Sequence, residues 1–292
     1  MAFKPARDRN HLAQVLAFNL GLSFVILDIR NLIQPLPNPI ACREPKDMSA
    51  DTLGTPAGPY PATPAQHTAA RIIGIIYPIQ MATGIFGEVF VRGQLIARGD
   101  PTRTAQNIMA SEQLFRLSIA GDLITYILVM VLTWAFYVLL RPVNRHLALL
   151  GAFFRLSELA VLCIATVNSL AILRLLSGAA YLKTFDVNQL HSLVMLAYNT
   201  QGQGMMVGFI LLGLGSAVFA YLLLRSRYVP KAFAVLGIFS SLLLALGTLV
   251  IIAFPGLGVI GMSYMMPMGL YEVGLGFWLL IKGIKTPSAQ QA

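Results

Sequence analysis

Six blocks of apolar residues, each about 20 residues or longer, constrain the fold of this 292-residue chain more than any other feature. At a rise of about 1.5 Å per residue, a helix of that length crosses the roughly 30 Å hydrocarbon core of a bilayer. Because lipid offers the backbone no hydrogen bonds, each block must satisfy its own peptide groups as a helix. The sequence therefore predicts an all-α, polytopic transmembrane helix bundle. The expected spans are residues 72–91, 118–140, 147–173, 204–224, 232–254 and 261–281.

The composition agrees with a membrane protein and argues against a nucleic-acid partner. Hydrophobic residues make up 57% of the chain and charged residues only 11%, whereas soluble domains carry roughly 25% charged residues. The net charge of +9 comes from short basic clusters between the apolar blocks. No zinc-finger or RNA-binding signature accompanies those clusters. We therefore expect the lipid bilayer, and no nucleic acid, as the main partner.

Lysine and arginine residues in the short loops predict the orientation of the helices. With six spans, four basic segments fall on one side, namely Arg71, residues 141–146, residues 225–231, and Lys282 with Lys285. Because basic loops stay in the cytoplasm, both termini of the helical core are expected there. The bias is incomplete, since the opposite side carries Arg92, Arg98, Arg103 and Lys183.

Residues 1–70 differ in composition from the six-span part. They contain an apolar segment at 12–29 and a stretch at 34–66 that is rich in Pro, Thr and Ala and typical of a disordered linker. Basic residues before the apolar segment and Arg71 after it both favour the cytoplasm, which conflicts with a seventh span. An interfacial segment, or a start of translation at Met48, is therefore favoured over a true span.

Residues 71–285 form the predicted six-helix transmembrane domain, and residues 286–292 form a cytoplasmic tail. Two connections on the outer side, at 101–117 and 186–203, have helical patterns of their own. Their apolar residues recur at intervals of three and four, which is typical of helices lying on the membrane or on a bundle. We therefore expect interfacial helices on the outer side in addition to the spans.

Three ionisable residues lie near the middle of predicted spans, where a charge is costly and is a functional hypothesis by default. Arg155 and Glu158 share a face of the third span at i, i+3, and Glu272 lies at a similar depth in the sixth. Two acids and one arginine would leave one carboxylate without a full partner, able to carry a proton. The alternative, which the sequence favours, is an Arg–Glu pair that locks two helices together.

A second polar group is predicted near the outer surface. Its members are Glu88, Arg92, Arg116, Asp122, Asn199, Gln201 and Gln203. These residues enter or leave their helices at about the same level, and they could line the mouth of a cavity for a polar ligand or a lipid headgroup. The alternative, favoured here, is an interfacial charge cluster in wet surroundings, where ionised groups cost little.

The remaining residues imply no metal or cofactor. The four histidines are scattered without HExxH spacing, and Cys42 and Cys163 form no CxxC pair. No GxSxG sequence marks a serine nucleophile. Catalytic residues are therefore not identified, and whether the chain is an enzyme stays open, with a non-enzyme favoured.

Several motifs resemble the bacterial domain-of-unknown-function 4386 family. They occur in order at 71–77 (RIIGIIY), 84–93 (GIFGEVFVRG), 107–116 (NIMASEQLFR), 139–145 (LLRPVNR), 154–158 (FRLSE) and 280–283 (LIKG). The resemblance covers roughly residues 70–285 and implies a multi-span protein of the bacterial cytoplasmic (inner) membrane. It marks as family positions Glu88, Arg92, Arg116, Asp122, Arg155 and Glu158. Residues 199–203 depart from the expected aromatic-glycine pattern, so nothing is carried over there.

The family resemblance implies no activity, and the residues leave three classes of function. A non-catalytic membrane scaffold or accessory protein is favoured, with the buried charges locking helices. The alternative is a membrane carrier or ligand-binding protein that takes a small molecule or a lipid into a polar intramembrane cavity. An intramembrane lipid-modifying enzyme is the second alternative. The sequence indicates neither the ligand nor the oligomeric state.

Overall fold

The computed structural model describes residues 62–254, 256 and 263–285, all of which belong to one compact unit, Pro56–Ala292. The apolar segment predicted at 12–29, Met48 and nearly all of the predicted linker lie outside these residues. So does the expected tail at 286–292.

The described part of the chain is helical and contains no strand. Six of its helical segments are long and apolar enough to cross a membrane, which confirms the predicted polytopic bundle. The elements are α2 (Pro64–Ile85), the π-helical segment η1 (Phe86–Arg92), α3 (Gly93–Leu95), α4 (Pro101–Ala110), α5 (Glu112–Leu140), α6 (Arg145–Leu175), the 3₁₀ segment η2 (Ala180–Thr184), α7 (Val187–Ser226), α8 (Lys231–Ala253) and α9 (Met266–Ile281).

Local sequence signals explain several of the helix ends. Thr63 and Gln66 form a capping box at the start of α2, which therefore begins before the predicted boundary at residue 72. Asn144 caps α6 by accepting from the Leu147 N–H at 3.0 Å. Arg227 ends α7 in a left-handed conformation, with φ of 57°.

The two predicted outer helices differ from expectation in their bounds. The segment 101–117 divides at Ser111, so that α4 is a separate short helix and the rest is the first turn of α5. The segment 186–203 continues without a break into the fourth span, because α7 is a single helix of 40 residues. Gly202 and Gly204 do not interrupt it, since an isolated glycine costs a helix only about 1 kcal/mol.

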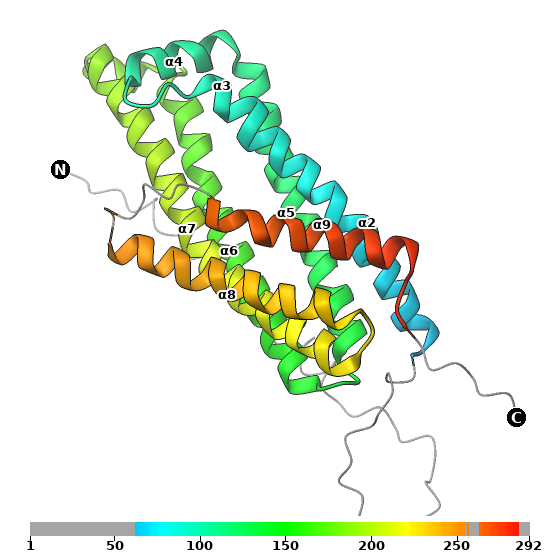
Figure 1. Cartoon of the computed structure of the whole chain (residues 1–292). Helices are drawn as coiled ribbons and strands as arrows, with labels where there is room; N and C mark the ends of the chain where they lie inside the picture. The colour runs from blue at the N-terminus through cyan, green and yellow to red at the C-terminus, as the bar shows by residue number, and fades with distance from the viewer. Residues whose placement is uncertain (1–61, 255, 257–262, 286–292) are drawn as a thin grey trace, which may run out of the picture. The chain divides into compact units, whose positions relative to one another are not determined.

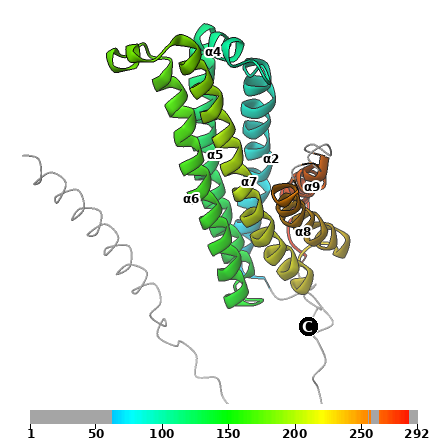
Figure 2. The same cartoon turned by 90° about the vertical axis from the view of Figure 1, so that its left-hand side faces the viewer.

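The six long helices form a closed ring. Neighbours pack in the order α2, α5, α6, α7, α8, α9, and α9 packs against α2 to close it. Figures 1 and 2 show α5, α6 and α7 running side by side, whereas α8 and α9 run obliquely to them. In both views α4 lies across one end of the bundle, which we call the α4 end.

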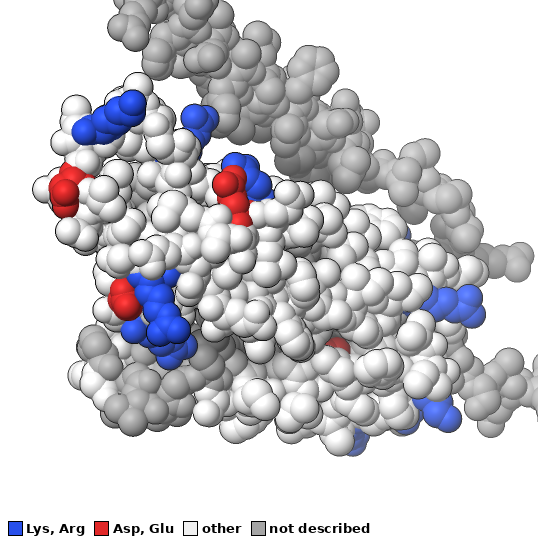
Figure 3. Space-filling model, turned by 90° about the horizontal axis from the view of Figure 1, so that it is seen from above, with Lys and Arg blue, Asp and Glu red and all other residues white. Residues whose placement is uncertain are grey.

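The two ends of the bundle differ in charge. Within the described residues, the end where α2 begins carries eight basic residues and no acidic one, and we call it the basic end. Its basic residues are Arg71, Arg141, Arg145, Arg225, Arg227, Lys231, Lys282 and Lys285. At the α4 end, basic and acidic side chains lie together in small groups (Figure 3). They are Arg98, Arg103, Arg116, Arg174 and Lys183 with Asp100, Glu112 and Asp186.

Two hydrophobic cores fill the bundle and leave a polar layer between them. The larger core occupies the half toward the basic end and includes Ile73, Leu132 and Leu279. The smaller core lies at the α4 end, where Val91, Phe115 and Val194 pack together. Among the described residues, the charged side chains that are less than a tenth exposed lie in this layer, and they are Arg92, Arg155, Glu158 and Glu272.

Glycines let neighbouring helices of the ring approach closely. A Cβ atom on Gly213 of α7 would lie 2.5 Å from the backbone oxygen of Ser241 and 2.8 Å from the Cβ of Ala245, both on α8. A Cβ on Gly74 of α2 would lie 2.7 Å from the backbone nitrogen of Leu280 on α9. These contacts are too short for any larger residue, as is common where transmembrane helices pack through small side chains.

We predict that Gly213→Ala destabilises the protein, because the new methyl group would meet backbone atoms of α8 that cannot move independently. The expected loss is about 1–3 kcal/mol of unfolding free energy, read as a lower midpoint of thermal unfolding in detergent. The matched control is Gly202→Ala in the same helix, where a Cβ meets nothing within 4 Å. That control should leave the midpoint unchanged or raise it, and equal midpoints for the two variants would contradict the packing.

Candidate functional site

A buried ion pair lies on α6 in the polar layer. Nη1 of Arg155 is 2.8 Å from Oε2 of Glu158, one turn further along the same helix. Both residues are 4% exposed. The two atoms are close but not aligned as a hydrogen bond. The pair forms on the face that the i, i+3 spacing indicated, but it joins two residues of one helix and does not link two helices.

Glu272 of α9 lies across the ring from this pair, beside Gln80 of α2. The two helices run antiparallel, with Tyr77 against Gly276 and Met81 against Gly269, so the level of Gln80 corresponds to that of Glu272. Gln80 is 8% and Glu272 7% exposed. Within the described residues, Oε1 of each side chain has no hydrogen-bond partner and Glu272 has no ion pair.

The Glu272 carboxylate nevertheless lies close enough to interact electrostatically with both Arg155 and Glu158. We call Gln80, Arg155, Glu158 and Glu272 the Glu272 cluster. Its members come from α2, α6 and α9, three helices of the ring. The three residues predicted from the sequence thus lie within electrostatic range of one another, and Gln80, which the sequence did not single out, adds an amide beside Glu272.

Glycines of α7 make room for the ion pair. A Cβ on Gly215 would lie 3.1 Å from the Cγ of Arg155, and one on Gly208 would lie 3.8 Å from the Cγ of Glu158. These glycines are seven residues apart, so they lie on one face of α7. A side chain at Gly215 would therefore crowd Arg155 in the α6–α7 interface, whereas the 3.8 Å at Gly208 is an ordinary contact with Glu158.

An aromatic layer closes the Glu272 cluster on the side of the basic end. Tyr77 contacts Phe136 edge to face at 5.8 Å between ring centroids, and Phe136 stacks on Phe219 at 4.9 Å. The three rings come from α2, α5 and α7. On α2, Tyr77 comes before Gln80 and therefore lies nearer the basic end. On α6, Gly151 comes before Arg155 and faces the Phe219 ring, so this ring also lies nearer the basic end. The rings belong to the larger core and form the part of it that borders the polar layer.

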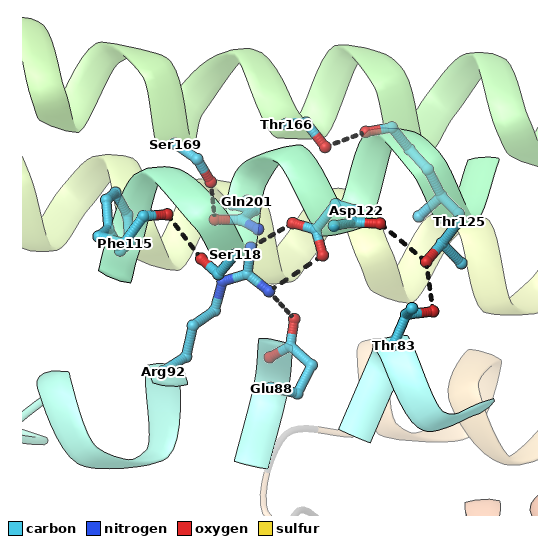
Figure 4. A network of polar contacts seen from close by, with 12 residues as sticks. Thr83, Glu88, Arg92, Phe115, Ser118, Asp122, Thr125, Thr166, Ser169 and Gln201 are labelled. Carbon is cyan, nitrogen blue, oxygen red and sulfur yellow. Dashed lines mark hydrogen bonds and ion pairs between the residues drawn. The ribbon is translucent and has the colours of Figure 1, made fainter. Parts of the chain in front are cut away.

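A second group of charges lies nearer the α4 end. Arg92 donates to Oε1 of Glu88 at 2.6 Å and also binds both carboxylate oxygens of Asp122 (Figure 4). The Arg92 side chain is 2% exposed, whereas those of Glu88 and Asp122 are 39% and 15% exposed. We call these three residues the Arg92 cluster. Because Arg92 follows α2 and Asp122 belongs to α5, this cluster connects two spans.

The Arg92 cluster is built on the π-helical segment η1. Glu88 and Arg92 both belong to it, and the N–H of Gly93 donates to the carbonyl of Glu88, five residues earlier. A π turn inside an α-helix is rare and is frequent at functional sites. Here the π turn adds one residue to the helical turn that carries Arg92 and Glu88.

Hydroxyl and amide groups extend the polar layer between the two clusters. Thr83 of α2 and Thr125 of α5 share a hydrogen bond at 2.7 Å, and Tyr126 bonds Thr166 of α6 at 2.9 Å. These residues are not evident from the sequence, because a threonine or tyrosine in an apolar block is ordinary and only its spatial neighbours reveal the layer.

The other predicted members of the outer group have different positions. Gln201 is buried and accepts from the Ser169 hydroxyl, in the same region of the bundle (Figure 4). Asn199 and Gln203 are exposed. Arg116 pairs with Glu112 at 2.6 Å, with side chains 59% and 53% exposed. Of the seven residues predicted for the outer group, Glu88, Arg92 and Asp122 therefore form the Arg92 cluster, and the other four do not belong to it.

Comparison with known proteins gives a family. The family described as "Domain of unknown function (DUF4386)" matches residues 72–283. An uncharacterized protein of Archaeoglobus fulgidus is 27% identical over 176 residues, which cover 58% of this chain and 85% of that protein. No solved structure matches. In the part of the chain that the structure describes, no three His, Cys, Asp or Glu residues are placed to hold a metal ion.

We predict that Arg92→Met lowers the thermal unfolding midpoint strongly, because it leaves two carboxylates facing each other without their cation. Breaking such a buried pair costs about 3–5 kcal/mol, or a shift on the order of 10 °C. The matched control is Arg116→Met, which breaks the exposed pair with Glu112 and should cost at most about 1 kcal/mol. Similar midpoints for both variants would show that the Arg92 cluster does not hold α2 to α5.

Proposed function

The chain belongs to the DUF4386 family of integral membrane proteins, and we propose that it is a membrane carrier or ligand-binding protein whose Glu272 cluster holds a small positively charged species. One observation carries this proposal. The Glu272 carboxylate is buried in the bundle, within the part that crosses the membrane, and has no ion pair among the described residues. An ionised carboxylate without a direct ion pair is costly in that position, so we infer that a proton or another cation accompanies it.

The charges of the cluster support a singly charged ligand. Arg155 contributes one positive charge, whereas Glu158 and Glu272 contribute two negative charges when both are ionised. The cluster is then one positive charge short of neutrality. Within the described residues, Oε1 of Gln80 and Oε1 of Glu272 have no hydrogen-bond partner and are the atoms that we expect to bind a proton or a small cation.

The same charges serve less well as a lock between helices. Arg155 and Glu158 lie on one helix, and Glu272, on the opposite side of the ring, makes no direct ion pair with either. In contrast, the ion pair of Arg92 with Asp122 joins η1, at the end of α2, to α5. An ion pair that holds two helices together therefore explains the Arg92 cluster but does not explain the Glu272 cluster.

The polar side chains of α2 and η1 suggest the side from which a ligand would reach the Glu272 cluster. Along α2 and η1, polar residues recur at intervals of three to five, at Gln80, Thr83, Glu88 and Arg92. Of these, Glu88 is partly exposed. On the opposite side, the rings of Tyr77, Phe136 and Phe219 separate the cluster from the basic end. A carrier in this conformation would exchange its ligand with the side where α4 lies.

We predict that the full-length protein in proteoliposomes admits protons or sodium ions, and that Glu272→Gln abolishes this uptake. A potassium gradient with valinomycin sets the membrane potential, and enclosed pH and sodium indicators report the two probes separately. Glutamine keeps the shape of the side chain and removes its charge, so the rate should fall to that of protein-free vesicles. Glu112→Gln, at an exposed pair outside the polar layer, is the control and should transport normally.

The second candidate is a non-catalytic scaffold or accessory protein, which the sequence alone favoured. The observation behind it is the burial of Arg155 and Glu158 in contact with each other, at 4% exposure each. In a scaffold, Glu272→Gln would change the unfolding midpoint, and neither the wild type nor the variant would admit protons or sodium. Absence of uptake in the wild type would therefore reject the carrier and leave the scaffold.

We further propose that the protein lies in the bacterial inner membrane with its basic end in the cytoplasm. Eight basic and no acidic residues at that end, within the described part, support this orientation. In a background with Cys42→Ser and Cys163→Ser, Lys183→Cys should react with a membrane-impermeant maleimide on intact cells. Lys231→Cys should react only after permeabilisation. Both positions are exposed, and the reverse pattern would overturn the orientation.

A further inference from the structure

A surface hollow lies between α5 and α6 at the α4 end, apart from both buried clusters. It has a volume of about 480 Å³ and is lined by Arg116, Leu170, Leu173, Arg174 and Ser177. Arg116 belongs to the first turn of α5, and Arg174 is the penultimate residue of α6. Both spans end here, so the hollow lies at the level of the phospholipid headgroups.

The two arginines of the hollow are available to an anion. Arg174 has no ion-pair partner among the described residues, and its backbone carbonyl accepts from the Ser177 hydroxyl at 2.7 Å, which fixes the turn after α6. Arg116 binds Glu112 through Nε and Nη2, and its Nη1 takes no part in that pair. A guanidinium has five N–H donors, so both side chains retain donors for phosphate oxygens.

The apolar residues of the hollow continue into a surface that suits acyl chains. Leu170 is 47% exposed, and Val167 below it is 60% exposed. Together with Cys163, which is also exposed, they form one stripe along α6 that leads from Arg174 toward the middle of the membrane. A ligand with a phosphate at one end and hydrocarbon at the other matches this arrangement.

The geometry points to a binding site for one anionic phospholipid, with its phosphate between Arg116 and Arg174 and an acyl chain along the Leu170 stripe. Glu112 balances one of the two arginines, so the hollow presents a net charge of +1. A headgroup with one negative charge neutralises it. A zwitterionic headgroup would bring its own ammonium group toward two guanidinium groups, which opposes binding.

The test uses the full-length protein purified in detergent and native mass spectrometry with phosphatidylglycerol and phosphatidylethanolamine of identical acyl chains. We expect retention of phosphatidylglycerol over phosphatidylethanolamine, and about tenfold weaker binding for Arg174→Gln, which removes a charge-assisted contact. Arg116→Gln should weaken binding in the same direction. Arg103→Gln changes an exposed arginine outside the hollow at the same end and should bind like the wild type.

Three outcomes would overturn the assignment. Equal retention of the two lipids would remove the charge selectivity, and an equal loss of binding in Arg103→Gln would make the effect one of general surface charge. Displacement of the lipid by inorganic phosphate at equal concentration would mean that the hollow recognises phosphate alone, without the acyl stripe. Because both arginines are exposed, the variants are expected to fold.

Discussion

Hydrocarbon does not solvate charge, and the interior of this protein is arranged around that constraint. The least exposed charged side chains of the described part gather in one polar layer between two apolar cores, in two groups that each join one arginine to two carboxylates. The spans form a ring in which glycines allow close approach at several interfaces, such as that of α2 with α9 and that of α7 with α8. Gly215 of α7, for example, leaves room beside α6 for Arg155.

The two groups use the same residue types with different results. Arg92 binds both of its carboxylate partners directly, so the attraction links two helices, and both acids are partly exposed. In the Glu272 cluster only one carboxylate has the arginine as a direct partner, and all members are buried. Geometry and burial, rather than composition, therefore separate a structural ion pair from a group suited to binding a ligand.

The sequence was enough to predict the spans, because length and apolarity are properties of single segments, and Arg155 with Glu158, because their spacing is local to one helix. Features that depend on ring neighbours were not accessible. In the sequence, Gln80 is a single amide in an apolar block, and only the packing of α9 shows that Glu272 lies beside it. Likewise, only the packing of three helices shows that the rings of Tyr77, Phe136 and Phe219 contact one another. Arg116 was grouped with Arg92 by depth alone, since a sequence gives the level of a residue but not the direction it faces around the ring.

The closure of the ring by α2 and α9 has a consequence for how the protein is made. These two spans are the least apolar of the six, and they contact each other although α2 is synthesised first and α9 last. During translation, α2 enters the bilayer long before the helix that covers the face bearing Gln80 exists. Pairing of consecutive spans therefore leaves the ring open, and the ring closes only when α9 packs against α2.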